Sequence, residues 1–354
     1  MKRCVRCIIP ASYPGVTLNE AGVCSLCLSH RPLTNVDKNS RQVELDEIIR
    51  QIKVQNGHYD VLVPWSGGKD STFVLYVMKK IYNLKVLALN YDNGFFSDFA
   101  KENIKNVSER LNVDVVILKP KWDLMRRMYA AFLRHRGEFC TVCNLVGYTI
   151  VLSFLMREKA LQGYSPLVVG GWSSRYEAQR DIHTFDYGSF SEVLCLENGL
   201  LDEFESSPFV EKRICELLRR QRDPRVAIKY KDNMGLRAIQ MPDYLTWNTQ
   251  EIVEVLKEEA GWKTPEGDRS ETHFDCIMHP VMKYLSIRRW GFAQDTVTLS
   301  AMIRDGMISR DEALQLVSKQ NFSKPLVMED LLSRLNITED DINWTSTWYT
   351  GNNV

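Results

Sequence analysis

The sequence predicts an α/β protein: a doubly wound parallel sheet preceded by an N-terminal zinc module and followed by a helical C-terminal part. Three observations lead to this prediction. Between residues 59 and 170, short apolar runs alternate with helical patterns, which is typical of a parallel sheet covered by helices. Two C-x-x-C pairs lie within the first 27 residues. From Thr246 onward, the apolar residues follow helical spacing.

This pattern divides the chain into four segments. Residues 1–31 are a Cys4 zinc-binding module, and residues 42–175 are the α/β domain. Residues 176–245 look irregular and are a candidate acceptor-binding insertion, and residues 246–354 are the helical part. The polar stretch from Pro32 to Arg41 is expected to be a linker.

Short apolar runs predict four buried strands. They are Tyr59–Pro64, Val86–Asn90, Val113–Leu118 and Leu167–Gly170. Apolar residues at helical spacing predict the helices of the α/β domain. These are Val43–Ile52, Thr72–Ile81, Asn103–Leu111 and Leu124–Arg134. The helices expected in the C-terminal part are Gln250–Glu259, Asp295–Asp305, Arg310–Gln320 and Glu329–Leu335, and a basic helix-like stretch, Val210–Arg222, lies in the irregular segment.

Composition excludes several classes of protein. Lys and Arg together number 45 among 354 residues and equal Asp and Glu, so no bulk charge indicates a nucleic-acid or membrane partner. The longest apolar runs, such as Tyr148–Met156, fall well short of the about 20 residues that span a membrane. The chain starts Met-Lys-Arg-Cys without an apolar stretch, so no secretory signal is expected. We expect a cytoplasmic protein.

The two N-terminal C-x-x-C pairs have the spacing of a structural zinc site. Cys4, Cys7, Cys24 and Cys27 can supply four thiolates to a tetrahedral Zn²⁺. The module is too short and too poor in large aliphatic residues to bury a core, so the metal would supply its folding energy. The alternative is four ordinary reduced cysteines.

The run Ser66-Gly-Gly-Lys-Asp-Ser71 is the most specific motif in the chain. It follows a predicted strand and opens a predicted helix, where backbone N–H groups and the helix dipole favour an anion. The two glycines let the backbone close around phosphate oxygens, and Lys69 can add positive charge. The spacing differs from that of the Walker A motif.

This run resembles the S-G-G-x-D-S signature of the PP-loop ATP pyrophosphatases. The resemblance implies ATP and Mg²⁺ as cofactors, with adenylation of a carbonyl or carboxyl oxygen and release of pyrophosphate. It places Asp70 near Mg²⁺. The residues it implies around the pyrophosphate are Ser66, Gly67, Gly68, Lys69, Asp70 and Ser71. It also implies Asn90 and Asp92 beside adenine and ribose, and Gly170 and Gly171 near the α-phosphate or ribose.

Cys140 and Cys143 form a third C-x-x-C pair, expected in a loop that faces the ligand crevice. Three interpretations stay open: ligands of a [4Fe–4S] cluster, a nucleophile with a resolving cysteine, or a buried inert pair. Some PP-loop tRNA thiolases resemble this arrangement, and they carry a third cysteine further on. Cys276 is the candidate third ligand.

Cys276 lies in Glu271–Pro280, the densest cluster of reactive side chains in the second half. His273 and His279 are candidate acid–base groups, since histidine titrates near neutrality, or candidate metal ligands. The alternative, which we favour for either one taken alone, is a hydrogen-bonded polar residue beside a helix start. Asp275 can orient an imidazole or hold Mg²⁺. The candidate catalytic set is Asp70, Cys140, Cys143, Cys276, His273 and Asp275.

A second resemblance spans most of the chain. The N-terminal cysteine spacing and the run Leu299–Leu314 resemble the N-acetyl sugar amidotransferases. In that family, ammonia from a glutaminase partner helps convert an acetamido group of a surface-polysaccharide sugar into an acetamidino group. The cysteine between two histidines in Glu271–Pro280 departs from the expected family pattern.

Two enzymatic functions therefore stay open. The first is sulfur insertion into a nucleotide base or similar small acceptor, with a sulfur donor protein as partner. The second is ammonia-dependent amidation of an N-acetyl sugar. A non-enzymatic alternative is a nucleic-acid-binding nucleotide sensor with an arginine patch formed by Arg213, Arg219, Arg220, Arg222 and Arg225. The oligomeric state stays open, with a homodimer among the assemblies allowed.

Overall fold

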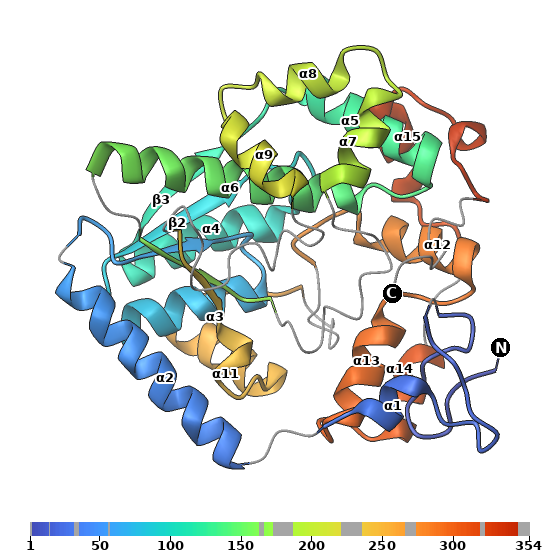
Figure 1. The fold of residues 1–354 in the computed structure, drawn as a ribbon, viewed down its shortest axis with the longest axis horizontal. Helices are drawn as coiled ribbons and strands as arrows, with labels where there is room; N and C mark the ends of the chain where they lie inside the picture. The colour runs from blue at the N-terminus through green and yellow to red at the C-terminus, as the bar shows by residue number, and fades with distance from the viewer. Residues whose placement is uncertain are drawn as a thin grey trace.

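Five parallel strands form one sheet in the order β3-β2-β1-β4-β5 (Figure 1). The computed structural model describes residues 2–13, 15–31, 35–55, 57–162, 166–172, 187–220, 236–265, 274–318 and 323–345. The strands are β1 (Val61–Pro64), β2 (Val86–Tyr91), β3 (Asp114–Leu118), β4 (Leu167–Gly170) and β5 (Ala238–Gln240). In the central strand, Val61 pairs with Val86 on one side and with Leu167 on the other. The doubly wound parallel sheet predicted from the sequence is confirmed.

The direction of winding reverses between β1 and β4. The first two crossovers, through α3 (Lys69–Tyr76) and α4 (Asp98–Leu111), lead from β1 to β2 and then to β3. The next crossover runs through α5 (Trp122–Arg136) and α6 (Cys140–Gln162) and returns past β1 to β4. In such sheets, ligands bind outside the carboxyl ends of the strands at the reversal point. The loops after β1 and β4 therefore border the expected crevice.

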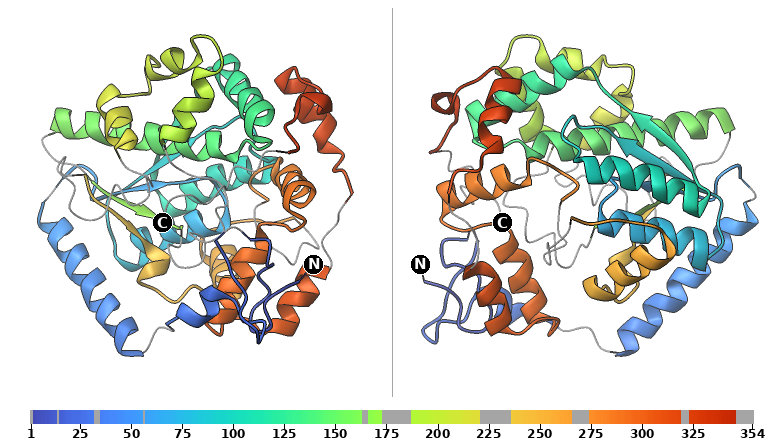
Figure 2. Two further views of the ribbon diagram at one scale, coloured as in Figure 1. Left: turned by 45° about the vertical axis from the view of Figure 1, so that its right-hand side comes forward. Right: turned by 180° about the vertical axis from the view of Figure 1, so that it is seen from behind.

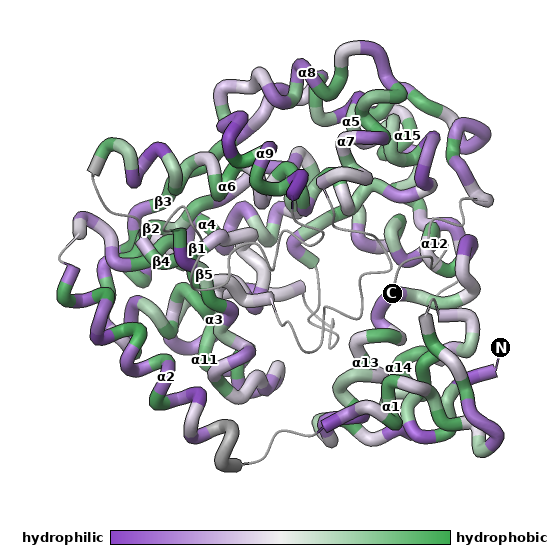
Figure 3. Tube along the Cα trace, in the orientation of Figure 1, coloured by the Kyte–Doolittle hydropathy of each residue, from purple (hydrophilic) through white to green (hydrophobic). Residues whose placement is uncertain are grey.

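Alternate residues of each strand pack into two apolar layers, which follows from the two-residue period of a strand. Leu62 of β1 packs into a core formed largely by α5, α6 and later helices. Val61 and Val63 pack into the opposite core, with α2 (Asn35–Val54), α3, α4 and α11 (Thr249–Glu259). Figure 3 shows the hydrophobic residues gathered along the central strands.

The segment expected to be irregular is partly regular. It contains α7 (Tyr187–Cys195), α8 (Leu200–Glu205), α9 (Lys212–Arg219) and the edge strand β5. These elements are short, so each offers too few buried positions for a clear periodicity. Phe190, Phe204 and Ile214 are buried in the same core as α5 and α6. The prediction of irregular structure is therefore wrong for α7, α8 and β5, whereas α9 lies within the predicted helix-like stretch Val210–Arg222.

Several helices begin before their predicted starts, because the first turns are polar and carry no apolar period. The expected linker Pro32–Arg41 is largely helical, since α2 begins at Asn35. The helix α4 begins at Asp98, where the side chain of Ser97 accepts a hydrogen bond from the backbone N–H of Ala100. The structure adds an unpredicted helix, α12 (His279–Trp290), with proline in its first turn.

Among the described residues, α6 is long and apolar enough to cross a membrane by length and composition. More than half of its most apolar window is buried within the protein (56%). Val142, Leu145, Val146 and Leu155 are among its buried residues. We interpret α6 as the central helix of one layer of the core.

The N-terminal module lies against the C-terminal helices α13 (Asp295–Arg304) and α14 (Arg310–Ser318), although they are distant in sequence (Figures 1 and 2). Ile9 packs with Phe292, and Ile8 packs with Ala313. The remaining C-terminal helices lie elsewhere: α11 packs on α3, and α15 (Val327–Leu335) packs on α5 and α12. The helical part is therefore distributed over the other segments.

Candidate functional site

The loop Ser66–Ser71 joins β1 to the first turn of α3, where the sheet reverses its winding. Gly67 has a φ of +80°, and a Cβ there would lie 2.6 Å from the carbonyl oxygen of Ala100. A Cβ at Gly68 would lie 2.8 Å from Oδ2 of Asp275. Gly67 therefore has to be glycine, whereas a side chain at Gly68 would displace the carboxylate of Asp275. The helix N-terminus that follows favours an anion.

Hydrogen bonds from other segments hold this loop. The indole nitrogen of Trp262 donates to the carbonyl oxygen of Gly67 at 3.0 Å. The hydroxyl of Thr72 donates to the carbonyl oxygen of Gly68 at 2.7 Å. The hydroxyl oxygens of Ser66 and Ser71 lie 3.3 Å apart. The backbone N–H of Gly68 donates to the hydroxyl oxygen of Ser66. The two serines thus help to set the shape of the loop.

Lys69 and Asp70 are paired. Nζ of Lys69 lies 2.5 Å from Oδ1 of Asp70, and the lysine side chain is buried. The indole nitrogen of Trp247 donates to the same carboxylate oxygen at 2.7 Å. The side chain of Asp70 is 37% exposed, so it is open to solvent and to a ligand.

The two residues predicted to lie beside adenine and ribose have structural partners. The amide of Asn90 is buried and donates to the carbonyl oxygen of Trp65 at 2.7 Å. Asp92 accepts a hydrogen bond from the backbone N–H of Gly94 at 2.9 Å, and Oδ2 of Asp92 lies 2.9 Å from Nζ of Lys119. These contacts connect β1 to β2 and shape the turn after β2.

Gly170 ends β4 and Gly171 follows it, at the same edge of the sheet. A Cβ at Gly171 would lie 2.9 Å from the carbonyl carbon of Asp70, so this glycine lets β4 approach the first turn of α3. A Cβ at Gly170 would lie 2.2 Å from Oε1 of Gln240. Gly171 thus lies against the Ser66–Ser71 loop, and a position of the pair near the α-phosphate or ribose stays a prediction.

The chain after residue 273 reaches the loop from the C-terminal half. The backbone N–H of Ser97 donates to the carbonyl oxygen of Asp275 at 3.0 Å, and that of Ile277 donates to the carbonyl oxygen of Phe95 at 3.0 Å. An antiparallel bridge joins Phe96 to Cys276. This pairing brings the carboxylate of Asp275 against Gly68.

Cys143 contacts the turn that follows β2, through Asn93. It belongs to the first turn of α6, and its Sγ accepts a hydrogen bond from Nδ2 of Asn93 at 3.0 Å. The pair Cys140-x-x-Cys143 was expected in a loop, but it is helical, which puts the two residues on one face of α6. Burial raises the pKa of Cys143 to about 11, and the hydrogen bond from Asn93 opposes that shift.

Cys276 lies near Cys143. Burial raises its pKa to about 12, and the neighbouring Cys143 adds to the shift. Cys140, Cys143 and Cys276 all pack against one hydrophobic cluster, so the structure gathers the three predicted cysteines in one region. Among the described residues, they are not grouped closely enough to bind a single metal ion. A cluster with several iron atoms would not require the three sulfur atoms to surround one ion, since each thiolate can bind a different iron.

The structure describes the remaining sequence candidates only in part, and the backbone N–H of His279 donates to the carbonyl oxygen of Cys276 at 3.1 Å. His273 lies outside the described residues, and His279 is the first residue of α12. On α9, Arg219 pairs with Glu205 and lies over the ring of Tyr187 at 5.6 Å. Arg222 and Arg225 lie outside the described residues, so the structure describes only part of the predicted arginine patch.

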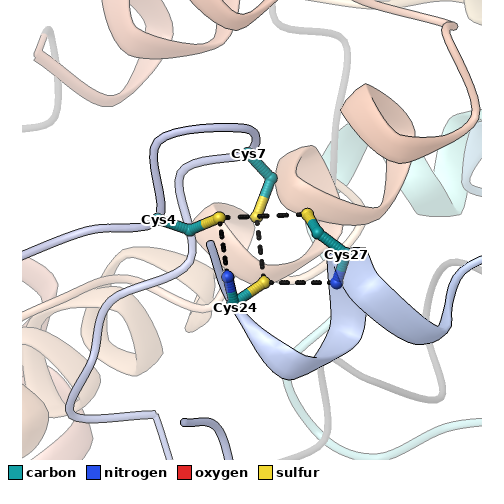
Figure 4. A group of neighbouring side chains, drawn as sticks. All are labelled: Cys4, Cys7, Cys24 and Cys27. Atoms are coloured by element: carbon teal, nitrogen blue, oxygen red, sulfur yellow. Dashed lines mark hydrogen bonds between the residues drawn. The ribbon is translucent and has the colours of Figure 1, made fainter. Parts of the chain in front are cut away.

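The N-terminal cysteines form a closed group. Sγ of Cys4 lies 3.9 Å from that of Cys27, and Sγ of Cys7 lies 3.7 Å from that of Cys24. All four sulfurs lie within 4.8 Å of one another and turn toward a common point (Figure 4). A regular tetrahedron with Zn–S bonds of about 2.3 Å has edges of about 3.8 Å, so the arrangement fits one Zn²⁺. Hydrogen bonds from Cys24 and Cys27 hold the pKa of Cys7 well below its usual range.

Comparison with known proteins gives one family match and several distant relatives. Residues 269–346 match a family model described as LPS biosynthesis protein WbpG-like, C-terminal domain. An uncharacterized protein of Methanocaldococcus jannaschii is 23% identical over 314 residues, which are 88% of each chain. Cytoplasmic tRNA 2-thiolation protein 1 of Arabidopsis thaliana is 26% identical over 165 residues, which are 40% of this chain and 46% of that protein.

Two solved structures match this chain at low similarity. The NH3-dependent NAD synthetase of Campylobacter jejuni is 16% identical, with a TM-score of 0.31, and covers 55% of this chain and 96% of its own. The U34-tRNA thiolase NcsA of Methanococcus maripaludis with its [4Fe-4S] cluster is 12% identical, with a TM-score of 0.31. It covers 94% of this chain and 95% of its own.

The strand order and the position of the Ser66–Ser71 loop at the reversal point agree with the PP-loop fold expected from the sequence motif. We call this loop the PP-loop after the motif that it resembles. The loop lies after β1, at the carboxyl edge of the sheet. The C-terminal half completes its surroundings with Trp247, Trp262 and Asp275.

Three side chains that contact the PP-loop or Cys143 were not among the residues predicted from the sequence. Asn93 contacts Cys143, Trp247 contacts Asp70, and Trp262 contacts Gly67. For Asn93, the signal was a polar residue at the carboxyl end of a buried strand, three positions after Asn90. The tryptophans lie in segments with no motif, so nothing local indicated their partners.

Zinc content tests the N-terminal group. We expect one Zn²⁺ per chain in the purified protein, and loss of zinc together with stability in Cys24→Ser, because the metal replaces a core in this module. Since the module packs on α13 and α14, amide hydrogen exchange should accelerate there and much less in the sheet. Cys195→Ser, at an exposed cysteine, is the control. Stable, zinc-free wild-type protein would contradict the assignment.

Alkaline unfolding tests whether Cys143 is an unligated thiol. In metal-free protein the thiol keeps its proton more tightly when folded, because its pKa is raised from 9.0 to about 11. Its contribution to the free energy of unfolding is therefore complete below about pH 9 and is lost as the pH rises toward 11, by about 1.4 kcal/mol per pH unit.

The measurement is urea unfolding at several values between pH 7 and 11. Cys143→Ala should show a shallower alkaline loss than the wild type, and Cys195→Ala should match the wild type. Equal slopes in all three proteins would show that Cys143 does not titrate in this way.

Proposed function

We propose that this protein is a cytoplasmic ATP-dependent enzyme that adenylates the carbonyl oxygen of an amide and then replaces that oxygen. The PP-loop supports ATP binding, because its glycines leave the backbone uncovered at a helix N-terminus. Asp70 belongs to the loop, and Asp275 contacts it from the C-terminal half of the chain. Both residues offer carboxylate oxygens suited to Mg²⁺. Bound there, Mg²⁺ would neutralise charge on the phosphates.

The chemistry balances in two steps. The amide oxygen attacks the α-phosphorus of ATP and the bond to pyrophosphate breaks, which leaves the amide carbon bonded to an AMP oxygen. A nucleophile then forms a bond to that carbon, and AMP departs with the former amide oxygen. Adenylation is needed because an amide oxygen is a poor leaving group, and a preorganised phosphate site stabilises the charge that develops.

For the acceptor, we propose the N-acetyl group of a surface-polysaccharide sugar, with ammonia from a glutaminase as the nucleophile. One observation carries this choice: Asp275, which lies against Gly68, belongs to the stretch that matches the LPS biosynthesis family. Cys276 belongs to the same stretch, so the cysteine that departed from the expected pattern does not separate the chain from that family. The product would be an acetamidino sugar.

Sulfur insertion is the second candidate, and the convergence of Cys143 and Cys276 favours it, together with the tRNA thiolation relative. Cys140, Cys143 and Cys276 would hold a [4Fe–4S] cluster, and their common apolar cluster fits such a group. When bound, the cluster would supply an open iron for sulfide. The acceptor would be a nucleotide base or a similar small molecule, and the sulfur donor would be a partner protein.

Asp70→Ala tests the adenylation site. We expect loss of pyrophosphate release by about two orders of magnitude or more, because the variant lacks a carboxylate beside the phosphate cradle. Circular dichroism should show an intact fold, since Asp70 is partly exposed. Asp98→Ala, at an exposed carboxylate in α4, is the matched control. Turnover of Asp70→Ala at the parent rate would remove Asp70 from the site.

An oxygen label distinguishes the two nucleophiles. With an N-acetyl sugar carrying ¹⁸O in its acetamido group, ATP and ammonium ions, the label should appear in AMP and an acetamidino sugar should form. Cys143→Ala and Cys276→Ala should keep this activity, because ammonia needs no thiolate. Activity only with sulfide, lost in both variants, together with iron and sulfide in anaerobically purified protein, would instead establish sulfur insertion.

A further inference from the structure

The carboxylate of Asp70 has two donors on one oxygen and none on the other. Nζ of Lys69 and Nε1 of Trp247 both contact Oδ1, at 2.5 and 2.7 Å. Within the part of the chain that the structure describes, Oδ2 has no hydrogen-bond partner. The carboxylate is therefore oriented by its first oxygen and open at its second.

The two donors respond differently to a bound phosphate. Lys69 belongs to the PP-loop itself, and its ammonium group is attracted to phosphate oxygens as strongly as to a carboxylate. When ATP binds, phosphate competes with Asp70 for this lysine. The indole N–H of Trp247 is a neutral donor and carries no net charge that a phosphate could attract. The hydrogen bond from Trp247 is the one that can persist.

The position of Trp247 is itself fixed. Its ring packs edge-on against Phe73 of α3, with ring centroids 5.2 Å apart and an interplanar angle of 78°. The next residue, Asn248, caps α11 by accepting hydrogen bonds from the backbone N–H groups of Gln250 and Glu251. The helix α11 packs on α3. Both sides of the tryptophan are thus tied to the helix that the PP-loop opens.

We propose that Trp247 is a positioning residue for the metal that accompanies ATP: it holds Oδ1 of Asp70 so that Oδ2 stays available as a ligand for Mg²⁺. This inference rests on the ATP site of the proposed function and does not depend on the acceptor or the nucleophile. It assigns a role in metal-dependent nucleotide binding to a residue far outside the nucleotide motif, 177 positions after Asp70.

The test compares ATP binding by calorimetry in Mg²⁺ and in EDTA, without acceptor. Trp247→Phe keeps the ring against Phe73 and removes only the N–H. We expect the Kd for ATP in Mg²⁺ to rise about tenfold and the Kd in EDTA to stay within twofold. The matched variant Trp262→Phe removes an indole N–H from the loop carbonyl of Gly67, so it should weaken ATP binding under both conditions.

A double-mutant cycle separates positioning from structural damage. In an Asp70→Asn background, which weakens the metal ligand, adding Trp247→Phe should change the Kd in Mg²⁺ by less than twofold. Equal loss of affinity with and without Mg²⁺ in Trp247→Phe, no loss in either, or a wild type indifferent to Mg²⁺ would each overturn the inference. If the binding pattern holds but no acceptor yields pyrophosphate, only the proposed function fails.

Discussion

The close approach of other segments to the backbone at Gly67 and Gly68 is the constraint on which the site depends. A single added methyl group would collide with the carbonyl of Ala100 at the first glycine and with the carboxylate of Asp275 at the second. The loop is therefore a contact point of β1, α4 and the C-terminal half. Trp262 contacts the carbonyl of Gly67, so the nucleotide loop takes its shape from segments that carry no nucleotide motif.

This dependence explains why the C-terminal half spreads over the molecule. The strand-like segment at Asp275 pairs with the turn after β2, α11 packs on α3, and α13 and α14 pack on the cysteine module. Arg310 donates to the carbonyl oxygen of Cys7, and His30 lies 3.0 Å from Asp305. A metal in the module would thus stabilise helices that follow directly on the residues facing the PP-loop.

The thiols near the PP-loop have an environment that decides their chemistry. Burial raises the pKa of both Cys143 and Cys276, so neither is a thiolate at neutral pH without a metal. Asn93 offers a hydrogen bond to the sulfur of Cys143, but one neutral donor does not offset burial in an apolar cluster. An unligated thiol here keeps its proton at neutral pH and is a weak nucleophile. Iron bound to these cysteines would therefore favour sulfur as the nucleophile, and thiols without a metal would favour ammonia.

The features that the sequence predicted depend on residues close together along the chain. The strand, the two glycines and the start of α3 are consecutive, so local spacing reveals the loop motif. Each cysteine pair of the N-terminal module spans four residues, so local spacing reveals these pairs as well. The four longer buried strands show as apolar runs for the same reason. In contrast, β5 has only three residues and α8 only six, too short to give a period, so the sequence predicted irregular structure there, within residues 176–245.

Only the tertiary structure decided which side chains meet at the loop. The buried amide of Asn90 donates to the carbonyl oxygen of Trp65, a partner that the sequence did not indicate. Asn93 reaches Cys143 because the chain turns at Gly94, where φ is +86°. Trp247 and Trp262 contact residues 177 and 195 positions away. Such contacts depend on how layers pack, and packing arises from the summed burial of many side chains rather than from any local pattern.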